Sequence, residues 1–202
     1  MSATDLSTDV WDVDENGFPA DAPFEDRLRF LLRYSILAPS SHNSQPWSFA
    51  VDGDTIHIHA DDSRWLEVAD AGRRELHISL GCALENLLIA AARFDFGFTV
   101  EYGTDKSDAV VSVRFDPAVA PDQSDDVALF EAITTRRTSH QVFLDRVIPS
   151  STLDQLRALV REDDVDLLLI DDETRKEKIA ELQVEADERQ MADPAYRREL
   201  GH

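Results

Sequence analysis

The chain has 202 residues, of which 41 are acidic and 20 are basic, and its formal net charge at pH 7 is -21. So negative a surface repels nucleic-acid phosphates and anionic lipids, which argues against a nucleic-acid-binding or membrane-binding protein. The single cysteine, Cys82, excludes an intrachain disulfide, and no signal peptide or run of roughly 20 apolar residues is evident, so we expect a cytoplasmic protein.

The basic side chains are mostly arginine, because Lys106, Lys176 and Lys178 are the only lysines. A surface rich in carboxylates and poor in lysine resembles that of proteins from extremely halophilic cytoplasms. At about 1 M salt the Debye length falls to roughly 3 Å, so the repulsion among the carboxylates is screened there. The composition therefore favours a halophilic protein with an acidic surface, and an ordinary acidic protein is the alternative.

The first predicted elements are an arm, a helix and a hairpin. Residues 1–23 are polar and acidic without a period, which predicts a flexible N-terminal arm. From Phe24 the apolar residues recur on one helical face, and the helix ends before Pro39. Trp47–Val51 and Thr55–Ala60 then alternate apolar and polar residues around an Asp-Gly-Asp turn, the pattern of a β-hairpin.

The longest periodic segment, Asp70–Phe96, carries a broad apolar stripe and is predicted to be the central buried helix. Gly97 follows it as a candidate C-cap. Phe98–Tyr102 and Ala109–Phe115 are predicted strands on either side of a polar turn.

A second unit is expected to begin near residue 125, after an acidic connector that contains proline. Val127–Thr134, Thr152–Arg161 and Glu173–Met191 are predicted helices, and the apolar run Val165–Ile170 is a predicted buried strand. Helices and strands alternate irregularly, which favours an α+β layered fold over a barrel.

The loop between Pro39 and Trp47 concentrates polar side chains in one turn-sized segment. Its hydroxyls, amides and imidazole offer neutral donors and acceptors that suit the edge of a planar heterocycle. Only His42 is a good metal ligand, and no Gly-x-Ser-x-Gly nucleophile motif is present, so a metal site or a serine nucleophile is not indicated. A hydrogen-bonded turn without a ligand is the alternative.

The run Ala-Pro-Ser-Ser-His-Asn-Ser-Gln-Pro-Trp at 38–47 resembles the A-P-S-x-x-N-x-Q-P-W signature of the nitroreductase family. The Asp-x-x-Arg-Arg-Glu start and the S-x-G-x-A-x-x-N-L pattern within 70–87 are similar to that family's long central helix. The resemblance implies an α+β fold with a mixed sheet packed by helices around that helix. It also implies that the loop lines a flavin through Ser40, Ser41, Asn43 and Gln45.

A second polar segment, Arg136–Ser139, stands out in the acidic chain. Adjacent guanidinium groups and hydroxyls suit a phosphate and a polyol, although two arginines at a helix end are also common partners of surface carboxylates. The segment resembles the R-R-S-x-x-x-F opening of a nitroreductase domain. That resemblance implies that Arg136, Arg137 and Ser139 hold the phosphate and ribityl chain of FMN.

The order of the two motifs resembles the tandem branch of the family, in which two halves share one chain. The implied domains are a first half at 24–124 and an incomplete second half at 125–202, with one composite FMN site. Such a second half exposes strand edges and apolar surface, which favours homodimerisation. Whether an incomplete second half still permits FMN binding stays open.

The resemblance implies an FMN-dependent oxidoreductase that reduces nitro compounds or quinones with NAD(P)H. No catalytic side chain is required, because the flavin carries the chemistry. A flavin-sequestering protein and a remnant without cofactor are the alternatives. No metal is expected: His57 and His59 share one face of a predicted strand, but that pattern is also typical of a half-exposed strand.

Overall fold

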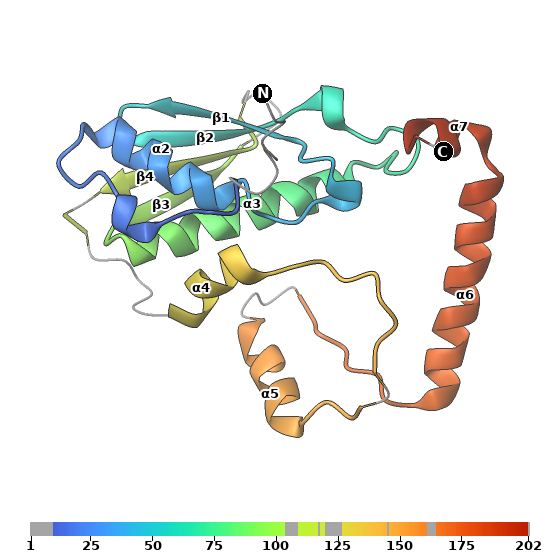
Figure 1. Cartoon of the computed structure of the whole chain (residues 1–202). Coiled ribbons are helices and arrows are strands. Elements are labelled where there is room, and N and C mark those ends of the chain that lie inside the picture. Colours follow the sequence, from blue (N-terminus) through green and yellow to red (C-terminus); the bar gives the residue numbers. More distant parts are fainter. Residues whose placement is uncertain are drawn as a thin grey trace, which may run out of the picture. The chain divides into compact units, whose positions relative to one another are not determined.

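The computed structural model describes residues 10–103, 109–116, 118–119, 127–144, 146–160 and 165–201. The chain divides into two compact units, residues 1–138 and residues 139–202. Figure 1 shows the elements of both. Each unit is described by itself below.

The first unit contains a four-stranded sheet in the order β1-β2-β4-β3. The predicted hairpin is confirmed as β1 (Trp47–Asp52) and β2 (Thr55–Ala60), and Gly53 takes the positive φ of +58° that the turn requires. β3 (Gly97–Tyr102) and β4 (Val111–Asp116) form a second hairpin, whose β4 pairs with β2. The predicted α+β class is confirmed, and all pairings among the described strands are antiparallel rather than mixed.

Apolar and polar side chains alternate along the strands, which places one face of the sheet in the core. Ile56 and Ile58 of β2 and Val113 of β4 are fully buried. Helices α2 (Phe24–Ser35) and α3 (Arg74–Arg93) pack against each other and against this face (Figure 1). The predicted amphipathic helix and the predicted central helix are therefore both present.

Helix α3 contributes a long buried stripe to this core. Its buried residues are Leu76, Ser79, Leu80, Ala83, Leu84, Leu87, Ala90 and Ala91. Among the described residues α3 is the helix that could cross a bilayer by length and composition, a feature that the sequence analysis did not anticipate. Its buried stripe and its charged ends show that here it serves as a core helix.

Residues 10–23 do not form the flexible arm that was predicted for 1–23. Trp11, Val13 and Phe18 pack against the core, and the ring of Phe18 stacks on that of Phe94 with centroids 4.5 Å apart. A short 3-10 helix, η1 (Glu15–Gly17), is capped by the Asp14 carboxylate. The prediction failed because three isolated aromatic and aliphatic anchors have no period; residues 1–9 lie outside the described part.

Gly97 is not the C-cap of α3. Asp95 takes the left-handed conformation at φ +61°, and Phe96 N–H donates to the Ala91 carbonyl at 2.9 Å to close the helix end. Gly97 instead begins β3, where a Cβ atom would lie 2.3 Å from the Val119 carbonyl oxygen. Close packing of backbone, rather than helix termination, therefore requires this glycine.

Helix α4 (Val127–Thr135) completes the first unit and buries Phe130 and Ile133 against it. Two further 3-10 turns, η2 (Ser41–Asn43) and η3 (Asp62–Arg64), lie in the connections around β1 and β2.

The second unit consists of helices and extended segments in its described part. α5 (Ser150–Leu159) and α6 (Glu173–Ala192) confirm two predicted helices, and α7 (Pro194–Glu199) is an element that the sequence did not indicate. The prediction of a buried strand at Val165–Ile170 is wrong: the segment forms no strand, and Leu168 is 80% exposed. An apolar run becomes a strand only where neighbouring strands pair with it.

Candidate functional site

The loop that follows α2 is held in an unusual backbone conformation. His42, Asn43 and Gln45 all have positive φ, at 49°, 56° and 51°. Non-glycine residues in this region cost about 1–3 kcal/mol each, and they cluster at binding and catalytic sites because the surrounding structure must hold them there. Part of that support is local, since the Ser40 hydroxyl accepts the Gln45 N–H at 2.9 Å.

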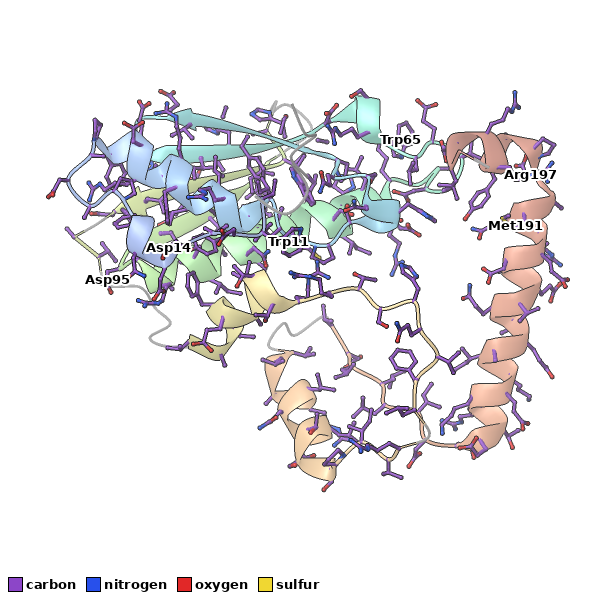
Figure 2. The ribbon with its side chains drawn as sticks, in the orientation of Figure 1. Trp11, Asp14, Trp65, Asp95, Met191 and Arg197 are labelled. Atoms are coloured by element: carbon purple, nitrogen blue, oxygen red, sulfur yellow. The ribbon has the colours of Figure 1, made fainter. Side chains whose placement is uncertain are left out.

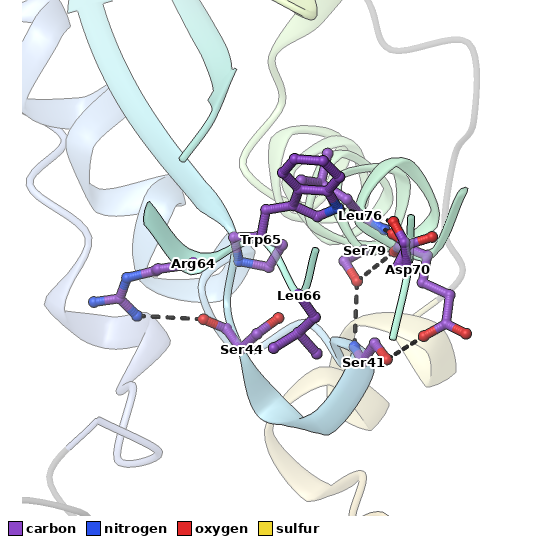
Figure 3. A pocket seen from close by; sticks show the side chains of 10 residues that line it. Ser41, Ser44, Arg64, Trp65, Leu66, Asp70, Leu76 and Ser79 are labelled. Atoms are coloured by element: carbon purple, nitrogen blue, oxygen red, sulfur yellow. Dashed lines mark hydrogen bonds between the residues drawn. The ribbon is translucent and has the colours of Figure 1, made fainter. Parts of the chain in front are cut away.

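Two serines fasten the loop to the first turns of α3. The Ser41 hydroxyl donates to the Glu75 carboxylate, and the Ser41 N–H donates to the Ser79 hydroxyl oxygen at 3.3 Å. Ser79 in turn donates to the Glu75 carbonyl at 2.8 Å. Figure 3 shows these contacts converging at the start of the helix. The main chain and side chain of Ser41 are thereby both fixed.

The start of α3 is itself locked by a buried carboxylate. Asp70, 8% exposed, accepts the Leu76 N–H at 2.8 Å, and the Trp65 indole N–H donates to the Asp70 carbonyl at 2.9 Å. The Arg73 guanidinium lies 4.3 Å from the centre of the Trp65 ring. These contacts, drawn partly in Figure 3, order the segment from which Glu75 and Ser79 project.

An open pocket of about 340 Å³ lies between the loop and α3. It is lined by Pro39, Ser40, Ser41, Glu75, Ile78, Ser79 and Cys82. The four helical residues follow i, i+3, i+4 and i+7 spacing, so they form one face of α3. The volume falls at the lower end of the roughly 300–1,000 Å³ typical of small-molecule pockets.

The two predicted arginines take different positions within the first unit. An Nη atom of Arg136 lies 3.5 Å from the Leu37 carbonyl oxygen, just before the loop. Burial raises the pKa of the Cys82 thiol, and the positive charge of Arg136 partly offsets that rise. Arg136 therefore lies near the Cys82 end of the pocket.

Both guanidinium groups face Trp11 of the N-terminal segment, and Arg137 is closer to the ring than Arg136, which lies 6.0 Å from its centre. The Arg137 guanidinium lies 4.2 Å from the centre of the Trp11 ring, and it donates to the Thr134 carbonyl at 3.0 Å. Trp11 is marked in Figure 2. This cation–π contact holds the half-buried Trp11 beside the arginines, a contact that the sequence did not predict.

The structure thus brings together three of the seven predicted site residues. Ser40 and Ser41 line the pocket and Arg136 stands near it, whereas Asn43, Gln45 and Arg137 are not among the lining residues. Ser139 belongs to the second unit, where its hydroxyl accepts the Gln141 N–H at 3.3 Å.

Sequence reasoning missed Glu75, Ile78 and Cys82 as pocket residues. The three residues share one helical face, beside the buried stripe of α3. Their spacing alone did not separate a pocket wall from the edge of the core.

The outer face of the sheet carries a second groove, of about 350 Å³. Its lining residues are Asp52, Asp54, Thr55, His57, Glu101, Ser112 and Arg114. His57 Nδ1 lies 2.8 Å from the Ser112 hydroxyl oxygen, a cross-strand hydrogen bond between β2 and β4. Over the residues that the structure describes, no three His, Cys, Asp or Glu side chains are grouped so as to hold a metal ion.

Sequence comparison finds relatives among mycobacterial proteins, while no family model matches the chain. Two Mycobacterium tuberculosis proteins named "Putative NAD(P)H nitroreductase" are similar to it. One is 31% identical over 133 residues, 65% of this chain and 38% of that protein; the other is 28% identical over 177 residues, 87% of this chain and 53% of that protein. An uncharacterized protein of the same organism is 29% identical over 171 residues.

The chain thus spans about half or less of the length of the curated relatives it matches. Among solved structures, the "Putative NADH Oxidase" from Clostridium acetobutylicum is similar to this chain. The alignment covers 50% of this chain and 79% of the chain of that structure. Its TM-score of 0.39 and sequence identity of 20% are too low to support an argument about the fold.

Proposed function

We propose that this chain, which is similar to proteins named "Putative NAD(P)H nitroreductase", is an FMN-binding oxidoreductase of the nitroreductase type. It would take electrons from NAD(P)H and pass them to a nitro compound or a quinone. The observation that carries the proposal is the pocket on one face of α3, where the strained loop meets the neighbourhood of Arg136.

The chemistry of the pocket fits a flavin. Pro39 and Ile78 offer apolar surface for a planar ring, and the hydroxyls of Ser40 and Ser41 offer neutral hydrogen-bonding groups for its polar edge. Arg136 supplies a forked cation suited to a phosphate. The pocket volume of about 340 Å³ is consistent with a ligand of this size lying partly in the open.

A bound flavin supplies the hydride and electron chemistry. The residues of this chain would therefore bind and orient rather than react. Glu75 and Ser79 hold Ser41 in place, and Ser41 with the loop sets the wall along which a ring can lie. Arg136 fixes the anionic end of the ligand. No general acid or base is needed, so a catalytic dyad is not part of the proposal.

The visible spectrum of the purified protein tests this proposal. We expect a yellow protein, or one that becomes yellow when FMN is added, and loss of the flavin absorbance when NADH or NADPH is supplied under exclusion of oxygen. Reoxidation by a nitroaromatic or a quinone completes the test. A colourless protein that takes up no FMN contradicts the proposal, and a yellow protein that neither nucleotide reduces indicates flavin sequestration instead.

Two finer proposals concern the setting in which the protein works. The net charge of -21 supports a role in a concentrated-salt cytoplasm, because screening removes self-repulsion. The midpoint temperature of thermal unfolding should then be higher in molar than in dilute potassium chloride. The exposed apolar residues of the second unit support pairing of two chains, which sedimentation in the same salt would test.

A further inference from the structure

Glu75 is the acidic residue of the pocket wall. Its carboxylate accepts the Ser41 hydroxyl, and the residue stands where the loop and α3 meet. No ion pair joins it to a basic side chain in the part of the chain that the structure describes. This wall of the pocket therefore presents a carboxylate that has a hydrogen bond but no cationic partner among the described residues.

The opposite end of the pocket carries the other sign. Cys82 lies two helical turns after Glu75 on the same face, about 10 Å along the axis. Arg136 acts on Cys82 electrostatically, so its positive charge is close to that end. The pocket is therefore polarised along α3, negative beside Ser41 and positive beside Cys82.

We propose that Glu75 sets the redox poise of the flavin: its charge lowers the reduction potential of the bound ring, while its hydrogen bond positions Ser41. This inference rests on the proposed function. Reduction by NAD(P)H transfers two electrons and one proton as hydride to the ring, and a ring that takes up no second proton carries one negative charge. A carboxylate in contact with it raises the free energy of that reduced form relative to the neutral oxidised form.

Burial strengthens the effect. Glu75 is exposed to water at the pocket wall, and a ring that fills the pocket covers it and displaces that water. The local dielectric then falls, and the repulsion between two negative charges grows. A lower potential makes the reduced flavin a stronger donor to an acceptor that is difficult to reduce.

The test separates charge from shape by comparing variants of the FMN-loaded protein in redox titrations against reference dyes. Glu75→Gln keeps the length and one hydrogen-bond acceptor but removes the charge, and the potential should shift to a more positive value. Glu75→Asp keeps the charge and should stay close to the wild-type potential. Glu101→Gln, which makes the same charge change on the outer face of the sheet, is the matched control and should not shift.

Ser41→Ala tests the positioning role. It removes the hydroxyl and leaves the carboxylate, so FMN affinity should fall several-fold while the potential stays closer to wild type than that of Glu75→Gln.

An unchanged potential in Glu75→Gln, with FMN still bound, overturns this inference and leaves the proposed function intact. Equal shifts in Glu75→Gln and Glu75→Asp also overturn it, because they would show an effect of shape alone. A wild-type protein that binds no FMN overturns both proposals together.

Discussion

The two units of the chain differ in how far their apolar side chains are buried. In the first unit, Leu28 of α2 and Ile56 of β2 are fully buried, and the sheet and helices enclose a single core. In the second unit, among its described residues, only Tyr196 is buried, whereas Val142 is 97% and Phe143 88% exposed. Apolar content alone therefore does not make a core; elements must close around it.

The same contrast explains where the candidate site lies. The first unit can hold a loop with three left-handed residues because Pro46 is buried and α3, to which the loop is fastened, packs against α2, α4 and the sheet. Strain of this kind persists only where packing over-determines the backbone. The second unit has no such enclosed frame in its described part, so its predicted contribution, Ser139, stays a prediction.

A matched pair of leucine truncations, one in each unit, tests this difference in burial. Leu28→Ala in α2 should lower the free energy of unfolding by about 2–5 kcal/mol, because it leaves a cavity in the core. Leu182→Ala in α6, where the side chain is 66% exposed, should change it by less than about 0.5 kcal/mol. Urea unfolding in high salt measures both, and equal losses would show that the second unit is packed after all.

The residues that the resemblance implies for FMN can each be tested by substitution. Arg136→Ala should weaken FMN binding by about 1.5–3 kcal/mol, the range for a charged hydrogen bond. Ser139→Ala should cost about 1 kcal/mol or less, because a neutral hydroxyl contributes less. Fluorescence titration with FMN gives both values. Arg137→Ala is the control for charge, since Arg137 packs on Trp11; a larger loss there than in Arg136→Ala would reverse the assignment of the two arginines.

Helix caps offer a third comparison between buried and exposed carboxylates. Asp70 is buried and accepts the Leu76 N–H, whereas Asp172 caps the exposed helix α6 through the Arg175 N–H. Asp70→Ala should destabilise the first unit by about 1–3 kcal/mol, because it leaves a buried donor unsatisfied. Asp172→Ala should cost about 1 kcal/mol or less and reduce only local helicity, as circular dichroism would show. Similar decreases in the free energy of unfolding for the two variants would contradict the difference in burial.

The smallest expected effect concerns Cys82. Burial raises the pKa of its thiol, and the thiolate is the form that alkylating agents attack. The pH profile of alkylation should therefore lie at higher pH than that of an unfolded cysteine. Arg136→Ala should move it further upward, because the guanidinium lowers this pKa. An unmoved profile would place Arg136 away from the pocket.

Much of the first unit follows from local pattern. The period of α2, the hairpin turn at Gly53 and the stripe of α3 each have a signature within a short window, and each element is present. The packing of residues 10–23 and the role of Gly97 were not predictable in this way, because both depend on side chains and backbone that approach from distant parts of the chain.

The candidate site shows the same division. The residue types of the loop and of the arginine pair are visible in the sequence, and they led to the nitroreductase resemblance that relatives confirm. The sequence could not predict the hydrogen bond between Ser41 and Glu75. Nor could it predict that Arg136 rather than Arg137 lies near Cys82, because helix phase and side-chain direction decide both contacts.

By itself, the sequence predicted the main helices and strands of the first unit, the net charge and the motif that resembles the nitroreductase signature, since each can be read from the residues alone. Only the tertiary structure decided which polar residues share a pocket and which apolar runs are buried. The physical reason is that burial and electrostatic coupling depend on distances between atoms, and folding sets these distances without regard to separation along the chain.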